Sequence, residues 1–351
     1  MGFGKRARSL MKRSSCKITP SAPFHFDATF HKPSNFPAPF TAWEPGRYWQ
    51  TIRIDGRLLG LRIENLGTSL RPSIRIVVFH NGGFEDRTKR ELRDELTWRF
   101  HLDADLREFD RRMRVDARFA PVFRRWRGMR GSNPYTLYEL MIVGVLLQNA
   151  TVRRTVQMTE ALLRAFGTQV SFDRKILFAM WTPAELRGVS EQELRALKVG
   201  YRAKMIKRLS AAFAAGEIDE FKLRAMDHES IRRELLKLYG VGPETARILL
   251  EAAFHYHSAI GHIAPWERKI YSRLFYNRRI VAESRIRDDL NRRHGEYATL
   301  AVGYIFEDVF WRRRHEHIPW LEKEIRLSRV GLDSRVDEPA GESWDATAAA
   351  Q

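Results

Sequence analysis

The hydrophobic period of this chain changes between residues 80 and 88, and that change constrains the fold more than any other feature. Before it, apolar and polar side chains alternate in segments separated by Gly- and Pro-containing stretches: FHFDATF (24–30), RYWQTIRI (47–54), RLLGLRIENL (57–66) and SIRIVVFH (73–80). A period of two is typical of strands that bury one face, and turn residues between them indicate hairpins. Residues 21–80 therefore predict an antiparallel sheet.

After this point the period is helical. TKRELRDELTWRFHL (88–102) places Leu92, Leu96 and Phe100 on one helical face. The apolar run Leu140–Leu147 indicates a helix that is buried on nearly all sides. Further helices are expected around 152–166, 174–180, 182–187, 190–197 and 201–215, after 265, after 282, and from 296 to about 313.

The order of these segments predicts an α+β fold, because strands and helices occupy separate parts of the chain. We expect an N-terminal antiparallel sheet domain over residues 21–105 and a mostly helical domain over 106–329. Residues 1–20 are basic and residues 330–351 are small, polar and acidic, so both ends are expected to be disordered tails.

The net charge of +18 indicates that the binding partner is negatively charged. Such a surplus attracts polyanions and indicates nucleic acid, although a basic surface can also serve solubility. No apolar run approaches the roughly 20 residues that would span a bilayer. Cys16 is the only cysteine, which excludes disulfides, Cys-built zinc sites and Cys-ligated iron–sulfur clusters. We expect a cytoplasmic or nucleoid-associated protein.

LYGVGPETARILL (238–250) has the pattern of a tight turn between two helices. Gly240 and Gly242 permit positive φ and close approach of another backbone, and Pro243 suits the first turn of the second helix. The free N–H groups and the positive dipole end of that helix can hold a phosphate. A plain helical hairpin with a glycine turn is the alternative interpretation.

The whole string resembles the helix-hairpin-helix motif of the HhH-GPD superfamily of DNA glycosylases. Other stretches match the alkyladenine (3-methyladenine DNA glycosylase II) and 8-oxoguanine glycosylase branch in family order, among them NPYTLYELMIVGVLLQNATVRRTVQM, LRGVSEQELRALKVGYRAKMIKRLS and RHGEYATLAVGYIFEDVF. The resemblance spans roughly residues 22–315. It implies that the hairpin, at about residues 231–250, grips the DNA backbone.

The resemblance also implies a wedge that opens the duplex. Asn149 aligns with the residue that fills the gap left by a flipped base, and Gln148 lies beside it. Alternatively, both residues only end a buried helix. The DNA backbone contacts implied by the resemblance are Gly240, Gly242, Glu244, Thr245, Arg153, Arg154 and Lys204.

The resemblance breaks at the two catalytic positions. The family's lysine, which attacks the sugar in bifunctional members, is replaced by Glu244, so lyase activity is not expected. The family's aspartate aligns with Ala264 in HIAPWERKI (262–270). Glu267, three residues further on, either takes over its work of stabilising a cationic sugar or is an ordinary acid in a helical first turn.

Aromatic side chains near this segment predict a base pocket built from Trp266, Tyr256 and His262, because flipped bases stack on aromatic rings. The histidine spacings fit no known metal site, so no metal and no cofactor are expected, although a structural monovalent cation at the hairpin is compatible with the motif.

These features together favour a monomeric, monofunctional DNA N-glycosylase of base excision repair. Its expected partner is double-stranded DNA with a damaged purine, alkylated or oxidised; cationic bases of the 3-methyladenine type need the least acid catalysis. The alternative is a catalytically inactive DNA-binding protein of the same fold that recognises lesions or distorted duplex. An RNA-binding helical protein is a third possibility.

Overall fold

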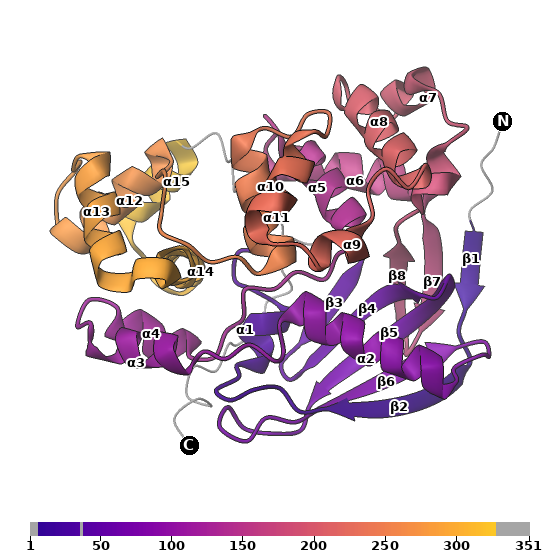
Figure 1. Cartoon of the computed structure of the whole chain (residues 1–351), viewed down its shortest axis with the longest axis horizontal. Coiled ribbons are helices and arrows are strands. Elements are labelled where there is room, and N and C mark those ends of the chain that lie inside the picture. Colours follow the sequence, from indigo (N-terminus) through magenta and orange to yellow (C-terminus); the bar gives the residue numbers. More distant parts are fainter. Residues whose placement is uncertain (1–5, 36–37, 328–351) are drawn as a thin grey trace.

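The computed structural model describes residues 6–35 and 38–327, and it confirms the predicted α+β architecture (Figure 1). An antiparallel five-stranded sheet has the order β2–β6–β5–β4–β3. Its strands are β2 (Lys12–Ile18), β3 (Thr41–Glu44), β4 (Arg47–Ile54), β5 (Arg57–Asn65) and β6 (Ile74–His80). The last three coincide with alternating segments of the sequence, so those strand predictions are confirmed.

The segment FHFDATF is not a strand but contains the short helix α1 (Phe26–Phe30). Phe26 and Phe30 lie four residues apart on one helical face, with ring centroids 4.7 Å apart. The imidazole Nδ1 of His25 accepts a hydrogen bond from the Ala28 N–H and caps the helix. Over so few residues, the phenylalanine spacing fits a strand and a helical turn equally well.

A second, three-stranded sheet joins residues of the predicted N-terminal tail to residues of the predicted helical domain. β1 (Arg6–Ser9) pairs in parallel with β7 (Thr168–Phe172), which pairs with β8 (Lys175–Ala179). Two predictions are therefore wrong: residues 6–18 of the expected tail form β1 and β2, and the helix expected at 174–180 is strand β8. The expected tail at 330–351 lies outside the described residues.

The two sheets pack against each other through an apolar layer that contains Trp49, Phe79, Val170 and Phe172. A Cβ on Gly60 would lie 2.6 Å from the Phe172 ring, so glycine is needed for this close approach. Helix α2 (Asp86–Phe100) covers the other face of the five-stranded sheet with Leu92, Leu96 and Phe100, as its sequence predicts.

The helical part of the described chain has two apolar cores. The first surrounds the expected buried helix, α5 (Leu137–Leu147). The second is built mainly from helices between residues 107 and 126 and between 265 and 315, which lie together in Figure 1. The elements are α3 (Arg107–Val115), α4 (Ala120–Trp126), α5 (Leu137–Leu147), α6 (Val152–Phe166), η1 (Pro183–Leu186), α7 (Glu191–Ala196), α8 (Arg202–Ala214), α9 (Glu220–Arg224), α10 (His228–Leu236), α11 (Pro243–Phe254), α12 (Pro265–Tyr276), α13 (Glu283–His294), η2 (Gly295–Tyr297), α14 (Ala298–His315) and α15 (Pro319–Leu327).

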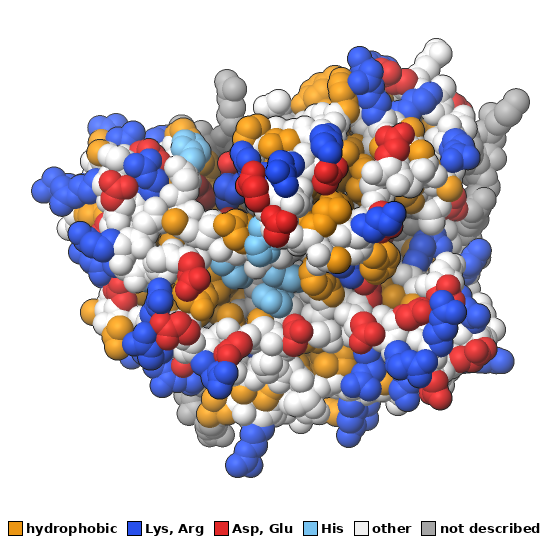
Figure 2. All heavy atoms as spheres, viewed as in Figure 1, with side chains coloured by type: hydrophobic (Ala, Val, Ile, Leu, Met, Phe, Trp, Pro, Cys, Tyr) orange, Lys and Arg blue, Asp and Glu red, His pale blue; other side chains and the backbone are white. Residues whose placement is uncertain are grey.

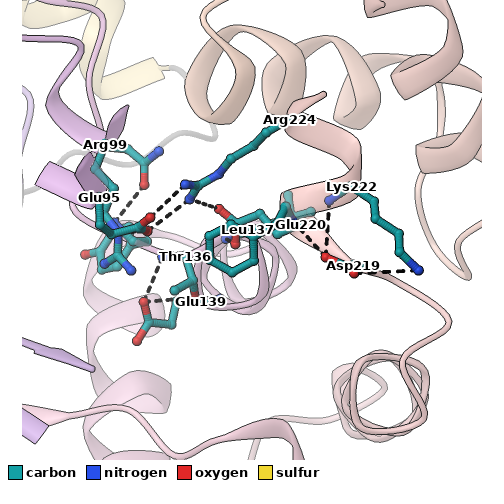
Figure 3. A network of polar contacts seen from close by, with 12 residues as sticks. Glu95, Arg99, Thr136, Leu137, Glu139, Asp219, Glu220, Lys222 and Arg224 are labelled. Carbon is teal, nitrogen blue, oxygen red and sulfur yellow. Dashed lines mark hydrogen bonds and ion pairs between the residues drawn. The ribbon is translucent and has the colours of Figure 1, made fainter. Parts of the chain in front are cut away.

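A buried ionic network holds α2 against the helical part (Figure 3). The Arg224 guanidinium of α9 donates to both carboxylate oxygens of Glu95 on α2, at 2.7 and 2.9 Å. Arg99 donates to Glu95 at 2.7 Å, and Glu220 bonds Arg224 and the Leu137 N–H at the start of α5. Because each charge has a partner, the network fixes how the sheet and the helices meet.

Replacing Glu95 with glutamine is expected to lower the free energy of unfolding by about 3 kcal/mol, because the buried Arg99 would lose its counter-charge and Arg224 would keep only Glu220. Burial raises the pKa of Glu95, but Arg224 and Arg99 lower it to about 2, from an ordinary 4.5. The carboxylate therefore stabilises the fold fully above about pH 4.5, and this contribution is lost as the pH falls toward 2.

Urea unfolding of wild type and Glu95→Gln between neutral and acidic pH measures this effect. Glu91→Gln, which breaks the more exposed Arg87–Glu91 pair on the same helix, is the matched control and should change stability much less. A difference between wild type and Glu95→Gln that does not shrink toward low pH would contradict this explanation.

Candidate DNA-binding and active site

The predicted hairpin is present as α10, a glycine turn and α11. Gly240 has φ +82°, in the left-handed region, and a Cβ there would meet the Met205 side chain of α8 at 2.2 Å. Gly242 is the N-cap of α11, and Pro243 occupies its first turn. The exposed Tyr239 ring lies beneath the cations of Lys204 and Arg208, at 5.8 and 4.1 Å. The turn thus presents a helix N-terminus beside basic side chains.

The predicted wedge is an exposed loop tip between α5 and α6. Asn149 at the tip has φ +49°, a left-handed conformation that asparagine tolerates, while Gln148 is half-buried. The buried Arg202 guanidinium donates to the backbone carbonyls of Gln148 and Val145. The Tyr201 hydroxyl donates to the Gln148 carbonyl at 3.3 Å and accepts from the Asn149 amide at 3.4 Å.

Arg202 and Tyr201 thus support the loop, a role that the sequence did not reveal. The signal was available, because both residues lie in the segment GYRAK that carries the family resemblance. Arg153 is exposed, and its side chain makes no hydrogen bond or ion pair within residues 6–35 and 38–327. Arg154, at the start of α6, donates a hydrogen bond to the Lys198 carbonyl in the loop before α8.

Helix α8 places the wedge and the hairpin turn on one side of the molecule. Tyr201 at its start contacts Asn149, and one helical turn later Lys204 and Met205 contact Tyr239 and Gly240. Four residues of helix rise by about 6 Å, so the loop tip and the turn are neighbours.

The family's aspartate position is the N-cap of α12, and Ala264 offers no side-chain acceptor there. Glu267 reaches back instead, and its Oε2 accepts a hydrogen bond from the Ala264 N–H at 3.0 Å. Burial raises the pKa of Glu267, while the Ala264 N–H and the Arg247 charge lower it; the net direction is upward. Glu267 is therefore a half-buried carboxyl that caps its own helix. This contact is compatible with a catalytic Glu267 and with an ordinary acid in a helical first turn.

Two carboxylates bind one cation, Arg247, whose charge also acts on Glu267. Arg247 of α11 donates to Glu244 at 2.5 and 3.1 Å and to Glu251 at 2.9 Å. Burial raises the pKa of Glu251, with Glu244 and Glu267 adding to the increase. We call Glu244, Arg247, Glu251 and Glu267 the acidic cluster. Arg247 and Glu251 were not foreseen, although their helical spacing from Glu244 could have indicated them.

The three predicted pocket residues each have a different neighbour. Trp266 packs edge-on against Phe306 of α14, with ring centroids 5.8 Å apart. Tyr256 lies on His228 at 4.2 Å and belongs to the other core, whereas His262 is mostly exposed, 3.9 Å from Glu283. Among the described residues no ring contact joins Trp266 to Tyr256 or His262. Phe306 is the aromatic neighbour that the sequence did not single out.

Histidine side chains gather near the middle of one face (Figure 2). The rings of His101 and His255 stack at 4.0 Å, with His257 next to them. Burial lowers the pKa values of His101, His255 and His257 to about 3, 4 and 4, so all three are neutral near pH 7. Within the part of the chain that the structure describes, no group of three or more His, Cys, Asp or Glu side chains has a geometry that could hold a metal ion.

A glycine turn with a free helix N-terminus, next to a supported loop tip, is the geometry of a helix-hairpin-helix motif, which can hold a phosphate. No family model matches the chain. A probable N-glycosylase/DNA lyase of Methanothermobacter thermautotrophicus is 26% identical over 242 residues, which cover 64% of this chain and 76% of that protein. No described helix is long and apolar enough to cross a membrane.

Two solved structures have the same fold. The 3-methyladenine DNA glycosylase from Archaeoglobus fulgidus superposes with a TM-score of 0.66 at 19% identity, over 86% of this chain and 100% of that one. The Clostridium acetobutylicum 8-oxoguanine glycosylase/lyase bound to double-stranded DNA gives 0.61 at 17% identity, over 87% and 99%. The proteins to which this chain is similar are DNA glycosylases of the 3-methyladenine and 8-oxoguanine kinds, which agrees with the family resemblance of its sequence.

Proposed function

We propose that this protein is a monofunctional DNA N-glycosylase of base excision repair, which flips a damaged purine out of double-stranded DNA and hydrolyses its glycosidic bond. The observation that carries the proposal is the link through α8 between the loop tip at Asn149 and the hairpin turn at Gly240. A backbone grip beside a wedge is what base flipping requires, because the unstacked base leaves a gap that must be filled. The similarity to DNA glycosylases supports the same activity.

The acidic cluster supports hydrolysis at the sugar. The departing base leaves a cationic sugar, and a nearby carboxylate lowers the energy of that state. Glu267 uses one oxygen to cap α12, and its other oxygen is our candidate for this role. Glu251, across from it on α11, is the second candidate. No lysine follows the hairpin glycines, so cleavage of the DNA strand is not expected.

We propose a cationic alkylated purine of the 3-methyladenine type as substrate. Such a base is a good leaving group, which suits a site whose carboxylate is displaced from the usual position. The Trp266–Phe306 pair offers aromatic surface for a cationic base, which stacks well on an electron-rich ring. Tyr256 and His262 are less favoured as pocket residues, because among the described residues neither makes a ring contact with Trp266.

Release of 3-methyladenine and 7-methylguanine from methylated duplex DNA tests the proposal, with strand breaks measured in the same samples. Free methylated base with intact strands is the expected result. Strand cleavage at the site of release would contradict the monofunctional assignment. Absence of release from methylated and oxidised duplexes, with binding retained, would contradict catalysis.

The alternative function, a catalytically inactive reader of damaged or distorted DNA, is favoured by two observations. Ala264 stands where the family has its aspartate, and the nearest carboxylate in sequence is engaged in a helix cap. Such a protein would keep the wedge and the hairpin and would bind a lesion without releasing it.

A further inference from the structure

A cavity of about 680 Å³ lies where the two sheets meet. Strands β2, β4, β5 and β6 line one side, and the tight β7–β8 turn, with Asp173 and Arg174 at φ 47° and 61°, lines the other. We call it the inter-sheet cavity. Its charged lining consists of Arg13, Arg47, Arg62, Arg174, Lys175, Glu44 and Asp173.

Both acids of the cavity already have cationic partners. Asp173 accepts hydrogen bonds from Arg62 and from the Trp49 indole, each at 2.7 Å. Glu44 accepts from Lys175, also at 2.7 Å. Two of the five cations are thereby neutralised, and the lining keeps a surplus of positive charge.

The three other arginines carry that surplus. Arg13 lies over the Phe79 ring, 5.4 Å from its centroid, and Arg47 and Arg174 project from the ends of neighbouring turns. Within the described ranges, 6–35 and 38–327, none of these three side chains makes a hydrogen bond or an ion pair. Guanidinium groups gathered without acceptors around a concave polar surface match the oxygens of phosphate groups, which they bind in a bidentate manner.

The aromatic residues of the cavity indicate that it would bind a phosphate group and not a base. Trp49, Phe79 and Phe172 are buried in the layer between the sheets, so they expose no face on which a base could stack. A ligand would thus be held through its phosphates and not through its bases, which is how proteins contact a nucleic-acid backbone without reading sequence.

The inter-sheet cavity is distant from the hairpin. Helix α6, which begins at the wedge loop, has 15 residues and is about 22 Å long. Strand β7 then continues away from α5 and α6 before the chain reaches Asp173 (Figure 1). We propose that the inter-sheet cavity is a second phosphate-binding site, which holds the backbone of a nucleic-acid segment separate from the one on the hairpin. This proposal goes beyond base release and does not depend on it.

The test compares the intact protein with Arg47→Glu/Arg174→Glu, and uses Arg90→Glu/Arg93→Glu as control. The control makes the same charge change on the exposed face of α2. Binding to a long undamaged duplex is measured over a range of salt concentrations. The slope of log K against log salt is expected to be less steep for the cavity variant by about 2 units, since each lost phosphate contact removes about 0.9. A control with an unchanged slope would localise the effect, and urea unfolding verifies that both variants fold.

A second arm identifies the source of the phosphate. Inorganic triphosphate is titrated into wild type and the cavity variant, alone and in competition with the duplex. A reduced salt dependence in the cavity variant, together with competition by triphosphate only in wild type, supports the nucleic-acid backbone. Triphosphate binding that depends on Arg47 and Arg174, with DNA slopes equal in variant and control, would assign the cavity to a free polyphosphate and overturn our assignment. Equal behaviour of variant and control in both arms would overturn the site altogether.

Discussion

Glu267→Gln is expected to reduce base release from methylated duplex DNA by about 100-fold, the usual cost of removing one group that stabilises charge in a transition state. Glutamine keeps an oxygen that can accept the Ala264 N–H, so the helix cap is preserved and only the charge is lost. The measurement is a single-turnover rate of release of methylated purine, which separates chemistry from product dissociation.

Glu283→Gln is the matched control for this substitution. The Glu283 carboxylate accepts the neighbouring Ile263 N–H at 3.2 Å, so it also supports the segment before α12, but it lies outside the acidic cluster. This variant should keep most of the wild-type rate. Full activity of Glu267→Gln, with activity lost in Glu251→Gln, would transfer the role to Glu251.

The same carboxyl gives a pH dependence of definite sign. A carboxylate that stabilises a cationic sugar acts in its ionised form, and burial raises the pKa of Glu267 above the ordinary 4.5. The rate of release should therefore decrease as the pH falls through that raised pKa, which lies closer to neutrality than an exposed glutamate would place it. The acidic limb should be absent from the residual activity of Glu267→Gln.

Arg202→Leu is expected to produce the second large effect, a reduction of at least about 10-fold in base release from fully paired duplex. Its buried guanidinium binds the carbonyls of Gln148 and Val145, which present Asn149 at the loop tip. A displacement of about 1 Å at such a site can cost about 100-fold in rate. Release from single-stranded methylated DNA should change much less, because no duplex has to be opened.

Rates on duplex and single-stranded substrates, with a fluorescent base analogue to report flipping, test this role of Arg202. Arg195→Leu makes the same substitution at an exposed arginine on α7, which pairs with Glu191, and should leave both rates near wild type. An equal loss on both substrates would indicate general destabilisation and would contradict the specific role of the loop.

The features that the sequence predicted correctly are those with local signals. The strands at 47–54 and 57–65, helix α2 and the buried helix α5 follow from hydrophobic periods that extend over two or more turns or several alternations. The hairpin follows from Gly240, Gly242 and Pro243, because their backbone preferences act without any partner. The same local signals, ordered along the chain, carried the superfamily resemblance.

The features that were missed depend on partners far away in the chain. β1 becomes a strand because its backbone pairs with β7, some 160 residues later, and β8 because its apolar side chains complete the layer beneath the five-stranded sheet. Five residues such as KILFA are too few to distinguish a strand from a helix without that layer.

The sequence by itself determined the α+β architecture, the glycine turn between α10 and α11, and the presence of Glu244 and Ala264 where the family it resembles has lysine and aspartate. Only the tertiary structure decided which side chains meet: Trp266 with Phe306 instead of Tyr256, Glu267 with its own helix cap, and Arg247 with Glu244 and Glu251. The physical reason is that backbone preference and hydrophobic period act along the chain, whereas charge pairing and ring packing depend on distances that exist only after the cores have closed.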